Sequence, residues 1–360
     1  MKTAAVAALV FLLAAIPARS QDAPAFSAPL TFTAGGTYSH RSSGLAEPLS
    51  PAGAGFRALV YPTARLGKGW YAAGAVQVRS RRMIYEQLDE PAERPEVDVI
   101  QAALGYERYW GKNFFGLRAG VMPTAFGSFA LRYDDSINPL IDVPVSSGYY
   151  YKNVTTLGLT GAQIDATFDK LDLRVQASTS SPANRRGPFQ SDQYLNWTGG
   201  LGWTFFQGLR VGASAYRGPY LDRGYRFYRP GEIRPKDLPA TGYGVDVQFA
   251  RGHWNVQAEL QRFQKAYTAI PTFEQVAGYG EVKYAFRPRW FVSFRGGREQ
   301  GGRPPTRTVL EGAIGYRVLP RQLVKVGYQA YRGSATRGSL GDVIGVQWVT
   351  RLDGVDSLWK

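Results

Sequence analysis

From Leu30 onward, apolar and polar residues alternate along the chain with a period of two. The stretches 209–216, 254–261 and 324–331 each place apolar residues at every second position, with polar residues or glycine between them. Successive side chains of a β-strand point to opposite faces, so each stretch would have one apolar and one polar face. A helical stripe of period 3.6 is not visible after the first twenty residues. The pattern predicts an all-β protein.

The alternation divides the chain into about sixteen strands, each long enough to cross a membrane. The connections between them are alternately short and long. Seven short links are expected at 64–67, 111, 169, 207, 251, 287 and 319–320. The predicted strands are 30–40, 53–63, 68–82, 97–110, 112–123, 154–168, 170–180, 193–206, 208–217, 241–250, 252–264, 274–286, 288–298, 307–318, 321–332 and 340–352.

This rhythm indicates a transmembrane, antiparallel, up-and-down β-barrel with both termini on the short-turn side. Aromatic residues such as Trp110, Trp254 and Trp290 gather beside the short turns, as an interfacial girdle would. A soluble β-sandwich or propeller also has alternating strands, but it would not explain the alternation of short and long connections. We therefore expect a membrane barrel.

The N-terminus carries an export signal. A basic Lys2 precedes an apolar run that ends at Pro17, and Ala18 and Ser20 suit cleavage by signal peptidase. The run is too short to cross about 30 Å of hydrocarbon. We expect a signal peptide at 1–20, a short periplasmic segment at 21–29, the barrel at 30–352 and a C-terminal tail at 353–360, in the outer membrane of a Gram-negative cell.

Composition narrows the chemistry further. The 360 residues include no cysteine and only two histidines, so disulfides, thiol catalysis and cysteine-ligated metals are excluded, and no cofactor is expected. The formal net charge is +15, which would suit a nucleic-acid-binding protein. The basic residues are spread through the strands and no recognition motif is present, so we expect no nucleic-acid partner.

If the apolar faces meet lipid, the polar faces line a lumen. Basic residues outnumber acidic ones there, which predicts a wet channel of positive mean potential that mildly favours anions. About half of these charges are expected to pair across neighbouring strands. The predicted lining bases are Arg57, Arg79, Arg81, Arg118, Arg174, Arg210, Lys283, Arg295, Arg317 and Lys325, and the acids are Glu107, Asp172, Asp246, Glu259, Glu281 and Glu311.

The third long connection, 124–153, is the longest. It has apolar residues of its own, and we predict that it folds into the barrel and narrows the channel. Its acids are expected to meet arginines of the wall and not to bind a metal ion. The residues predicted to form this constriction are Phe126, Gly127, Arg132, Asp134, Asp135 and Asp142.

Around this connection the sequence resembles a known family. The residues Arg118-Ala-Gly-Val-Met-Pro123-Thr-Ala-Phe-Gly127, then Arg132-Tyr-Asp134 and Asn138-Pro-Leu-Ile-Asp142, resemble bacterial outer-membrane porins, most of all the phosphate-selective O/P type. The segment from Gly341 to Val349 resembles their closing strand. The resemblance implies sixteen strands, an infolded third loop and usually a homotrimer. Phosphate-selective members carry lysines at the constriction, whereas this loop has three acids with Arg132 and, at its edge, Lys152.

Two other functions remain open. A structural or adhesive barrel would have a closed lumen. An outer-membrane enzyme would need a catalytic constellation on one rim, but His40 and His253 are expected at opposite membrane faces. We expect a passive diffusion channel that lies in outer-membrane lipid and passes small hydrophilic or anionic solutes.

Overall fold

The structure is a computed structural model of the chain. It describes residues 26–39, 52–80, 95–128, 134–146, 158–179, 194–221, 234–266, 272–301, 306–333 and 342–354. The predicted signal peptide, Arg81, Arg132 and large parts of the long connections lie outside these ranges. Among the described residues, no helix is long and apolar enough to cross a bilayer.

Eighteen strand segments form one continuous sheet. They are β1 (Phe26–Ser27), β2 (Leu30–Ser39), β3 (Ala52–Val60), β4 (Thr63–Gly67), β5 (Trp70–Arg79), β6 (Glu96–Trp110), β7 (Asn113–Met122), β8 (Leu159–Phe168), β9 (Leu171–Ser178), β10 (Asn196–Phe206), β11 (Leu209–Pro219), β12 (Pro239–Arg251), β13 (Trp254–Lys265), β14 (Phe273–Arg287), β15 (Trp290–Gln300), β16 (Thr306–Leu319), β17 (Gln322–Gly333) and β18 (Val343–Leu352). The single-turn helix η3 (Pro235–Asp237) precedes β12.

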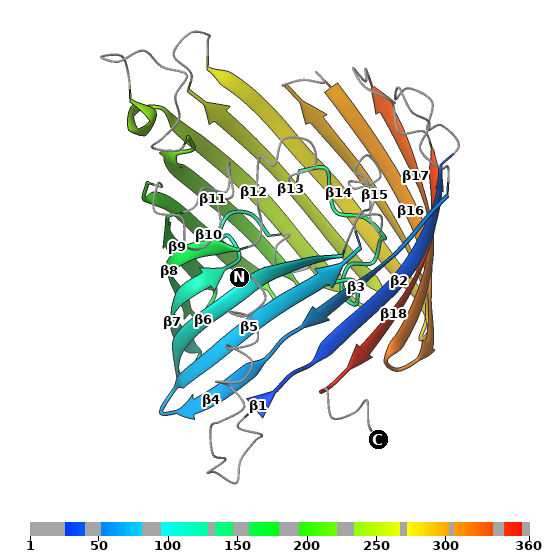
Figure 1. Ribbon diagram of the computed structural model, residues 1–360, viewed down its shortest axis with the longest axis horizontal. Helices are drawn as coiled ribbons and strands as arrows, with labels where there is room; N and C mark the ends of the chain where they lie inside the picture. The colour runs from blue at the N-terminus through cyan, green and yellow to red at the C-terminus, as the bar shows by residue number, and fades with distance from the viewer. Residues whose placement is uncertain are drawn as a thin grey trace.

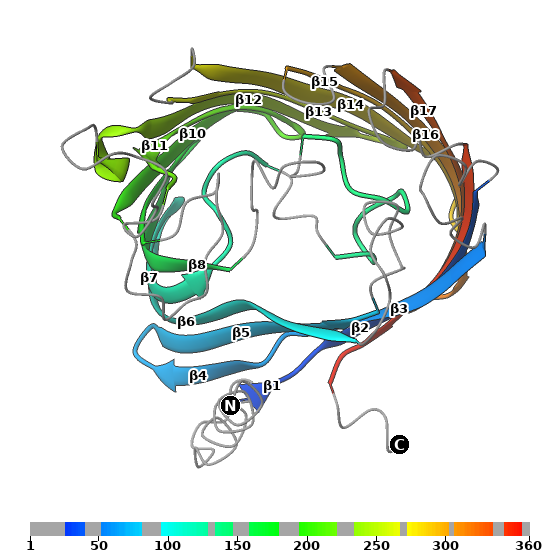
Figure 2. The same ribbon diagram turned by 45° about the horizontal axis from the view of Figure 1, so that its top comes forward.

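The sheet closes on itself into a barrel (Figures 1 and 2). Every strand pairs antiparallel with the next one along the chain, and β18 returns to pair with β2, where Val343 lies opposite Ser39. Segments β3 and β4 are two parts of one strand, and β1 extends β2 by two residues. The result is a closed barrel of sixteen antiparallel strands, which confirms the predicted fold class.

Seven hairpins are closed by turns of two residues. These turns are 68–69, 111–112, 169–170, 207–208, 252–253, 288–289 and 320–321. Lys68 and Asp169 have positive φ angles, as do the turn glycines Gly69 and Gly111. Positive φ is the conformation that tight hairpin turns require. The predicted number and order of the short links are therefore confirmed.

Three predicted links lie too early in the chain: 64–67 falls within β4, 251 is the last residue of β12 and 287 is the last residue of β14. We expected residues 64–67 to form a turn, but they belong to β4, and the turn is at Lys68 and Gly69. The misleading residue is Pro62, which has no N–H to donate and interrupts the ladder between β3 and β4. The Pro62 carbonyl instead accepts a bond from the Gly74 N–H at 2.7 Å. Opposite this interruption, a side chain on Gly74 would collide with the Pro62 ring.

Candidate channel lining and constriction

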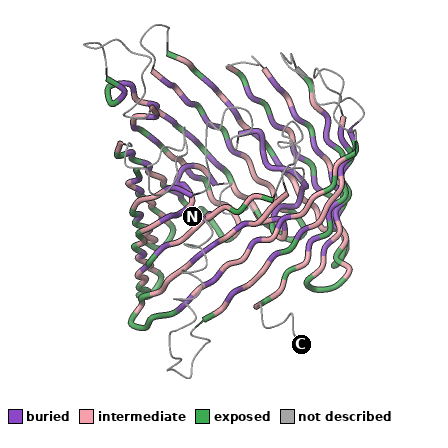
Figure 3. Tube along the Cα trace, viewed as in Figure 1, coloured by how far each residue is buried: buried purple, intermediate pink, exposed green. Residues whose placement is uncertain are grey.

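The two faces of the barrel wall differ in chemistry. On β16, Leu310 is 40% exposed on the outer face, whereas its neighbour Glu311 is 2% exposed on the inner face. The same alternation runs through most strands, as the mixed colours along each strand in Figure 3 show. Large apolar side chains therefore cover the outside, and charged and amide side chains cover the inside.

Two parts of the third long connection contact the inner face of the wall. Figure 2 draws both parts of this connection inside the ring of strands. In the first part, the backbone N–H of Ala125 donates to Gln176 Oε1 at 3.0 Å. Phe126 packs in a buried cluster with Tyr216 and Phe263, its ring 5.0 Å from that of Phe263.

Gly127 allows the connection to approach the wall closely. Its φ angle is +73°, and a Cβ there would lie 2.1 Å from Glu259 Oε1. The next residue, Ser128, donates from its backbone N–H and its hydroxyl to the Glu259 carboxylate. A residue larger than glycine would be strained and would push against this contact.

The second part, 134–146, is held by charges from widely separated strands. Arg57 of β3 forms a buried ion pair with Asp135, and Arg57 Nε lies 2.9 Å from Asp135 Oδ2. Lys325 of β17 is fully buried and donates to the carbonyl oxygens of Asp135, Asn138 and Leu140 at 2.9–3.1 Å. Burial opposes ionisation of Asp135, but the charges of Arg57 and Lys325 prevail and hold its pKa below the usual value.

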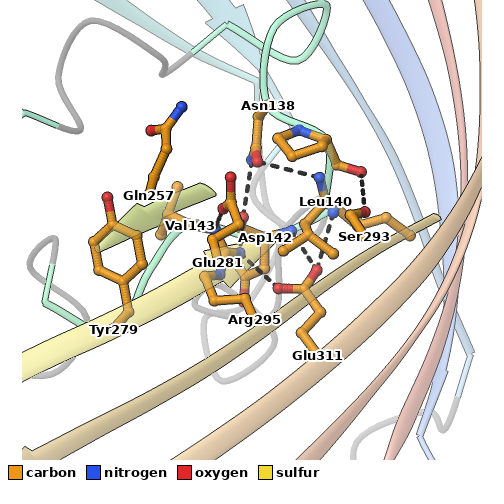
Figure 4. A network of polar contacts seen from close by, with 12 residues as sticks. Asn138, Leu140, Asp142, Val143, Gln257, Tyr279, Glu281, Ser293, Arg295 and Glu311 are labelled. Atoms are coloured by element: carbon orange, nitrogen blue, oxygen red, sulfur yellow. Dashed lines mark hydrogen bonds and ion pairs between the residues drawn. The ribbon is translucent and has the colours of Figure 1, made fainter. Parts of the chain in front are cut away.

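A third anchor surrounds Arg295 of β15 (Figure 4). Its guanidinium lies between two carboxylates, 3.2 Å from Glu281 and 2.6 Å from Glu311. Arg295 also donates to the carbonyl oxygen of Asp142. Glu311 Oε1 in turn accepts the backbone N–H groups of Ile141 and Asp142 at 3.0 and 3.1 Å.

Asp142 brings a third carboxyl group close to the guanidinium of Arg295, which contacts the backbone carbonyl of Asp142. Burial and the neighbouring charge of Glu311 raise the pKa of Asp142 to about 7. The side chain still accepts bonds from the Val143 N–H and, at 3.4 Å, from Gln329. Near neutral pH the Asp142 carboxyl group therefore changes its protonation state.

A ladder of alternating charges covers the inner wall of β7–β12. Arg118 and Arg174 share Asp165, at 2.6 and 2.9 Å. Arg210 bridges Asp172 and Asp246 at 2.7 and 2.8 Å. The ladder crosses β10 because Gly202 has no side chain there: a Cβ would lie 2.1 Å from Arg210 Nη2 and 2.4 Å from Asp172 Oδ2.

The remaining predicted lining residues fall into smaller groups. Arg79 lies 3.4 Å from both Glu96 and Asp98, and the Glu107 carboxylate accepts from the Tyr109 hydroxyl at 3.5 Å. Lys283 of β14 lies over the Phe291 ring, and Arg317 of β16 donates to the Pro320 carbonyl near the short turns. Neither Lys283 nor Arg317 forms an ion pair with a described carboxylate.

The structure thus places most of the predicted charges in two sets. Beneath the third connection lie Arg57, Glu259, Glu281, Arg295, Glu311 and Lys325. In the ladder lie Arg118, Asp172, Arg174, Arg210 and Asp246. Six of the predicted bases are ion-paired: Arg57, Arg79, Arg118, Arg174, Arg210 and Arg295.

Four inner-face acids were not foreseen from the sequence: Glu96, Asp98, Asp165 and Glu299, the last paired with Arg307. A β-bulge between β5 and β6 explains the first two. Gln101 pairs with Ala75 but Val99 pairs with Val76, so one extra residue shifts the alternation and turns Asp98 inward. Asp165 lies in the predicted strand 154–168, where the apolar–polar alternation of the sequence changes phase near Gly161. There, a Cβ on Gly161 would lie 2.0 Å from the Ala177 carbonyl oxygen.

No model of a known protein family matches the chain, and no curated protein matches it. Solved structures do. OprB of Pseudomonas putida superposes with a TM-score of 0.65 at 12% identity, covering 91% of this chain and 94% of that one. OmpF of Salmonella typhi, solved with daunomycin, gives 0.63 at 12% identity over 91% and 97%. OmpT of Vibrio cholerae in its trimer form gives 0.60 at 12% identity over 92% and 100%. The chain therefore has the fold of bacterial outer-membrane porins.

Proposed function

We propose that the protein is an outer-membrane porin, a water-filled channel through which small hydrophilic solutes diffuse passively. The observation that carries this proposal is a closed sixteen-strand barrel with an apolar outer face and a charged inner face. A barrel of this size is too wide for wall side chains to fill. An apolar band facing lipid and a polar interior are the arrangement of membrane channels of this architecture.

Solute size is set where the third connection occupies part of the lumen. Residues 124–128 and 134–146 are held to the inner wall by Gln176, Glu259, Glu311 and Lys325. Solutes then pass between this connection and the ladder on β7–β12. The ladder offers hydrogen-bond donors and acceptors in close alternation, which suits hydrated polar molecules.

The selectivity that we propose is a mild preference for anions. The ladder arginines are neutralised by Asp165, Asp172 and Asp246, so they contribute little net field. Lys283 and Arg317 carry the preference because no described carboxylate pairs with either. Phosphate is the anion to compare with chloride, given the resemblance to phosphate-selective porins around residues 118–142.

The decisive experiment is a conductance measurement. The protein from Gln21 onward is refolded and inserted into a planar bilayer under a KCl gradient. Stable single-channel steps with a chloride-favouring reversal potential support both parts of the proposal. Steps without ion preference support a channel and reject the anion preference. Correctly folded, heat-modifiable protein that never conducts would support a structural barrel with a closed lumen.

We also propose that the barrel assembles as a homotrimer. One similar structure, OmpT of Vibrio cholerae, was solved in a trimer form. Mass measurement of the refolded protein by light scattering tests this, with a monomeric mass as the contrary result.

A further inference from the structure

A groove of about 550 Å³ crosses the outer face of the barrel over β12–β16. Its volume is within the range of cavities that hold small ligands. Its sides are aliphatic: Val245, Leu260 and Leu310 are each 40–53% exposed on the outer face. The exposed residues of the groove alternate along each strand with the inward-facing residues of the charge clusters described above.

The floor of the groove is formed by glycines and one alanine. Ala258, Gly280 and Gly296 lie side by side in register on three adjacent strands, and Gly278 precedes Gly280 on the same face. A Cβ added at Gly280 would meet nothing within 4 Å, and one at Gly296 would meet the Leu310 side chain at 3.5 Å and the Phe294 ring at 3.9 Å. The hollow is therefore open to the surroundings of the barrel.

One end of the groove carries a positive charge. Arg298 lies two residues beyond Gly296, opposite Gly278, toward the end of β15 that is remote from the two-residue turns. Arg298 forms no ion pair with a described residue. On the same outer face, Arg262 of β13 already pairs with Glu274 at 2.9 Å. An arginine on a membrane-facing wall extends toward the headgroup region, where phosphates are available.

We infer that this groove binds one acyl chain of an anionic phospholipid, with the headgroup phosphate on Arg298. The inference rests on the proposed function only for the placement of the barrel in a membrane. The aliphatic sides and the glycine floor take the chain, because an apolar hollow facing lipid would otherwise be poorly filled. Arg298 supplies selectivity for an anionic headgroup by a charge-assisted hydrogen bond.

A second copy of the chain fits this surface less well. A protein partner would have to bring a carboxylate to Arg298. Two exposed acids at the long-connection ends of the described strands, Glu274 and Asp342, are already paired, with Arg262 and Arg332 respectively. A lipid phosphate provides the complementary charge without breaking either pair.

The test uses the refolded protein from Gln21 onward, stripped of lipid in detergent. Native mass spectrometry then measures binding of phosphatidylglycerol and of phosphatidylcholine with identical acyl chains. The unmodified protein should retain one phosphatidylglycerol in preference to phosphatidylcholine. Gly280→Leu fills the groove and should weaken binding of both lipids by about tenfold or more. Arg298→Gln should remove the headgroup preference while leaving binding of the acyl chain.

Gly312→Leu is the matched control. Gly312 also faces outward, on β16 beside the groove, and a Cβ there would approach only the Ser293 carbonyl oxygen, at 3.9 Å. This variant should bind lipid like the parent. Unchanged binding in Gly280→Leu, or an intact headgroup preference in Arg298→Gln, would overturn the inference. Loss of oligomerisation without loss of lipid binding in Gly280→Leu would assign the groove to a second copy instead. The conductance of every variant is measured in parallel, so that a failure of lipid binding can be distinguished from a failure of the proposed channel.

Discussion

Arg57 Nε donates to Asp135 Oδ2 at 2.9 Å, although 78 positions separate the two residues in the chain. Both side chains are almost fully buried, at 4% and 1% exposure. The pair joins β3 to the connection that follows β7, so it fixes the third connection against a distant part of the wall. Lys325 reaches the same stretch from β17.

Removing one partner of this pair should release the connection. Arg57→Met removes the ion-pair partner of the buried Asp135 and leaves only the charge of Lys325 nearby; breaking a buried pair typically costs about 3–5 kcal/mol. We expect faster protease cleavage within 134–146 and noisier single-channel currents. Arg79→Met is the comparison, because Arg79 is a more exposed base directly opposite Arg57. Equal protease resistance of the Arg57→Met variant and the parent would contradict a holding role.

The Asp142 anchor should loosen as pH rises. Its pKa is about 7 in the bound connection, whereas a free aspartate titrates near about 4. The bound form therefore holds its proton more tightly. The contribution to stability is complete below about pH 4, falls between about pH 4 and 7, and is lost above the higher value. The slope in that window is up to about 1.4 kcal/mol per pH unit.

Hydrogen exchange at the amides of Ile141, Asp142 and Val143 measures this effect. Protection should decrease from pH 5 to pH 8 after correction for intrinsic exchange rates. Asp142→Asn should remove most of the pH dependence while keeping an oxygen for the Val143 N–H. A variant with the same pH dependence as the parent would show that another group titrates.

Charge reversal should affect selectivity most at the unpaired bases. Lys283→Glu together with Arg317→Glu should move the reversal potential toward cation preference, because both bases face inward without a described carboxylate partner. Arg174→Glu should also shift it, since Asp165 would then face one arginine and one new acid. The control is Arg108→Glu, an exposed outward position on β6, which should leave the reversal potential unchanged. A shift in the control as large as in the double variant would mean that net charge alone sets the potential.

Gly127→Ala should weaken the approach of the connection to β13. A positive φ costs about 1–2 kcal/mol for a residue with a Cβ, and that Cβ would also press on Glu259. We expect increased protease cleavage near 124–128. Gly199→Ala provides the control, because its Cβ would meet only the Arg174 carbonyl oxygen at 3.9 Å. Identical cleavage of the two variants would argue against a close contact at Gly127.

The barrel was predictable because its rule is local. Alternation of period two and a turn every ten or so residues define each hairpin without reference to the rest of the chain. Errors arose where a single residue broke the rule. Pro62 misled the placement of the first two-residue turn, and the extra residue between Val99 and Gln101 reversed the faces of Glu96 and Asp98.

The pairing of the inner charges was less accessible. Arg295 depends on Glu281 and Glu311 from neighbouring strands, which register could suggest. Its contact with the Asp142 carbonyl joins residues 153 positions apart and follows only from the path of the third connection. The use of Lys325 to bind three backbone carbonyls has no sequence signal, since any inward lysine would look the same.

The pairing of β18 with β2 has a consequence for how the protein is made. Apart from this seam, each strand meets the one just before it, so hairpins can add in order as the polypeptide emerges. The seam joins the first long strand to the last, and it cannot form until translation and export have delivered residues 343–352. Until then both seam strands expose unpaired backbone groups, which are templates for wrong partners. A product truncated before Val343 would keep two open edges, and quality control should destroy it, however well its remaining hairpins pair.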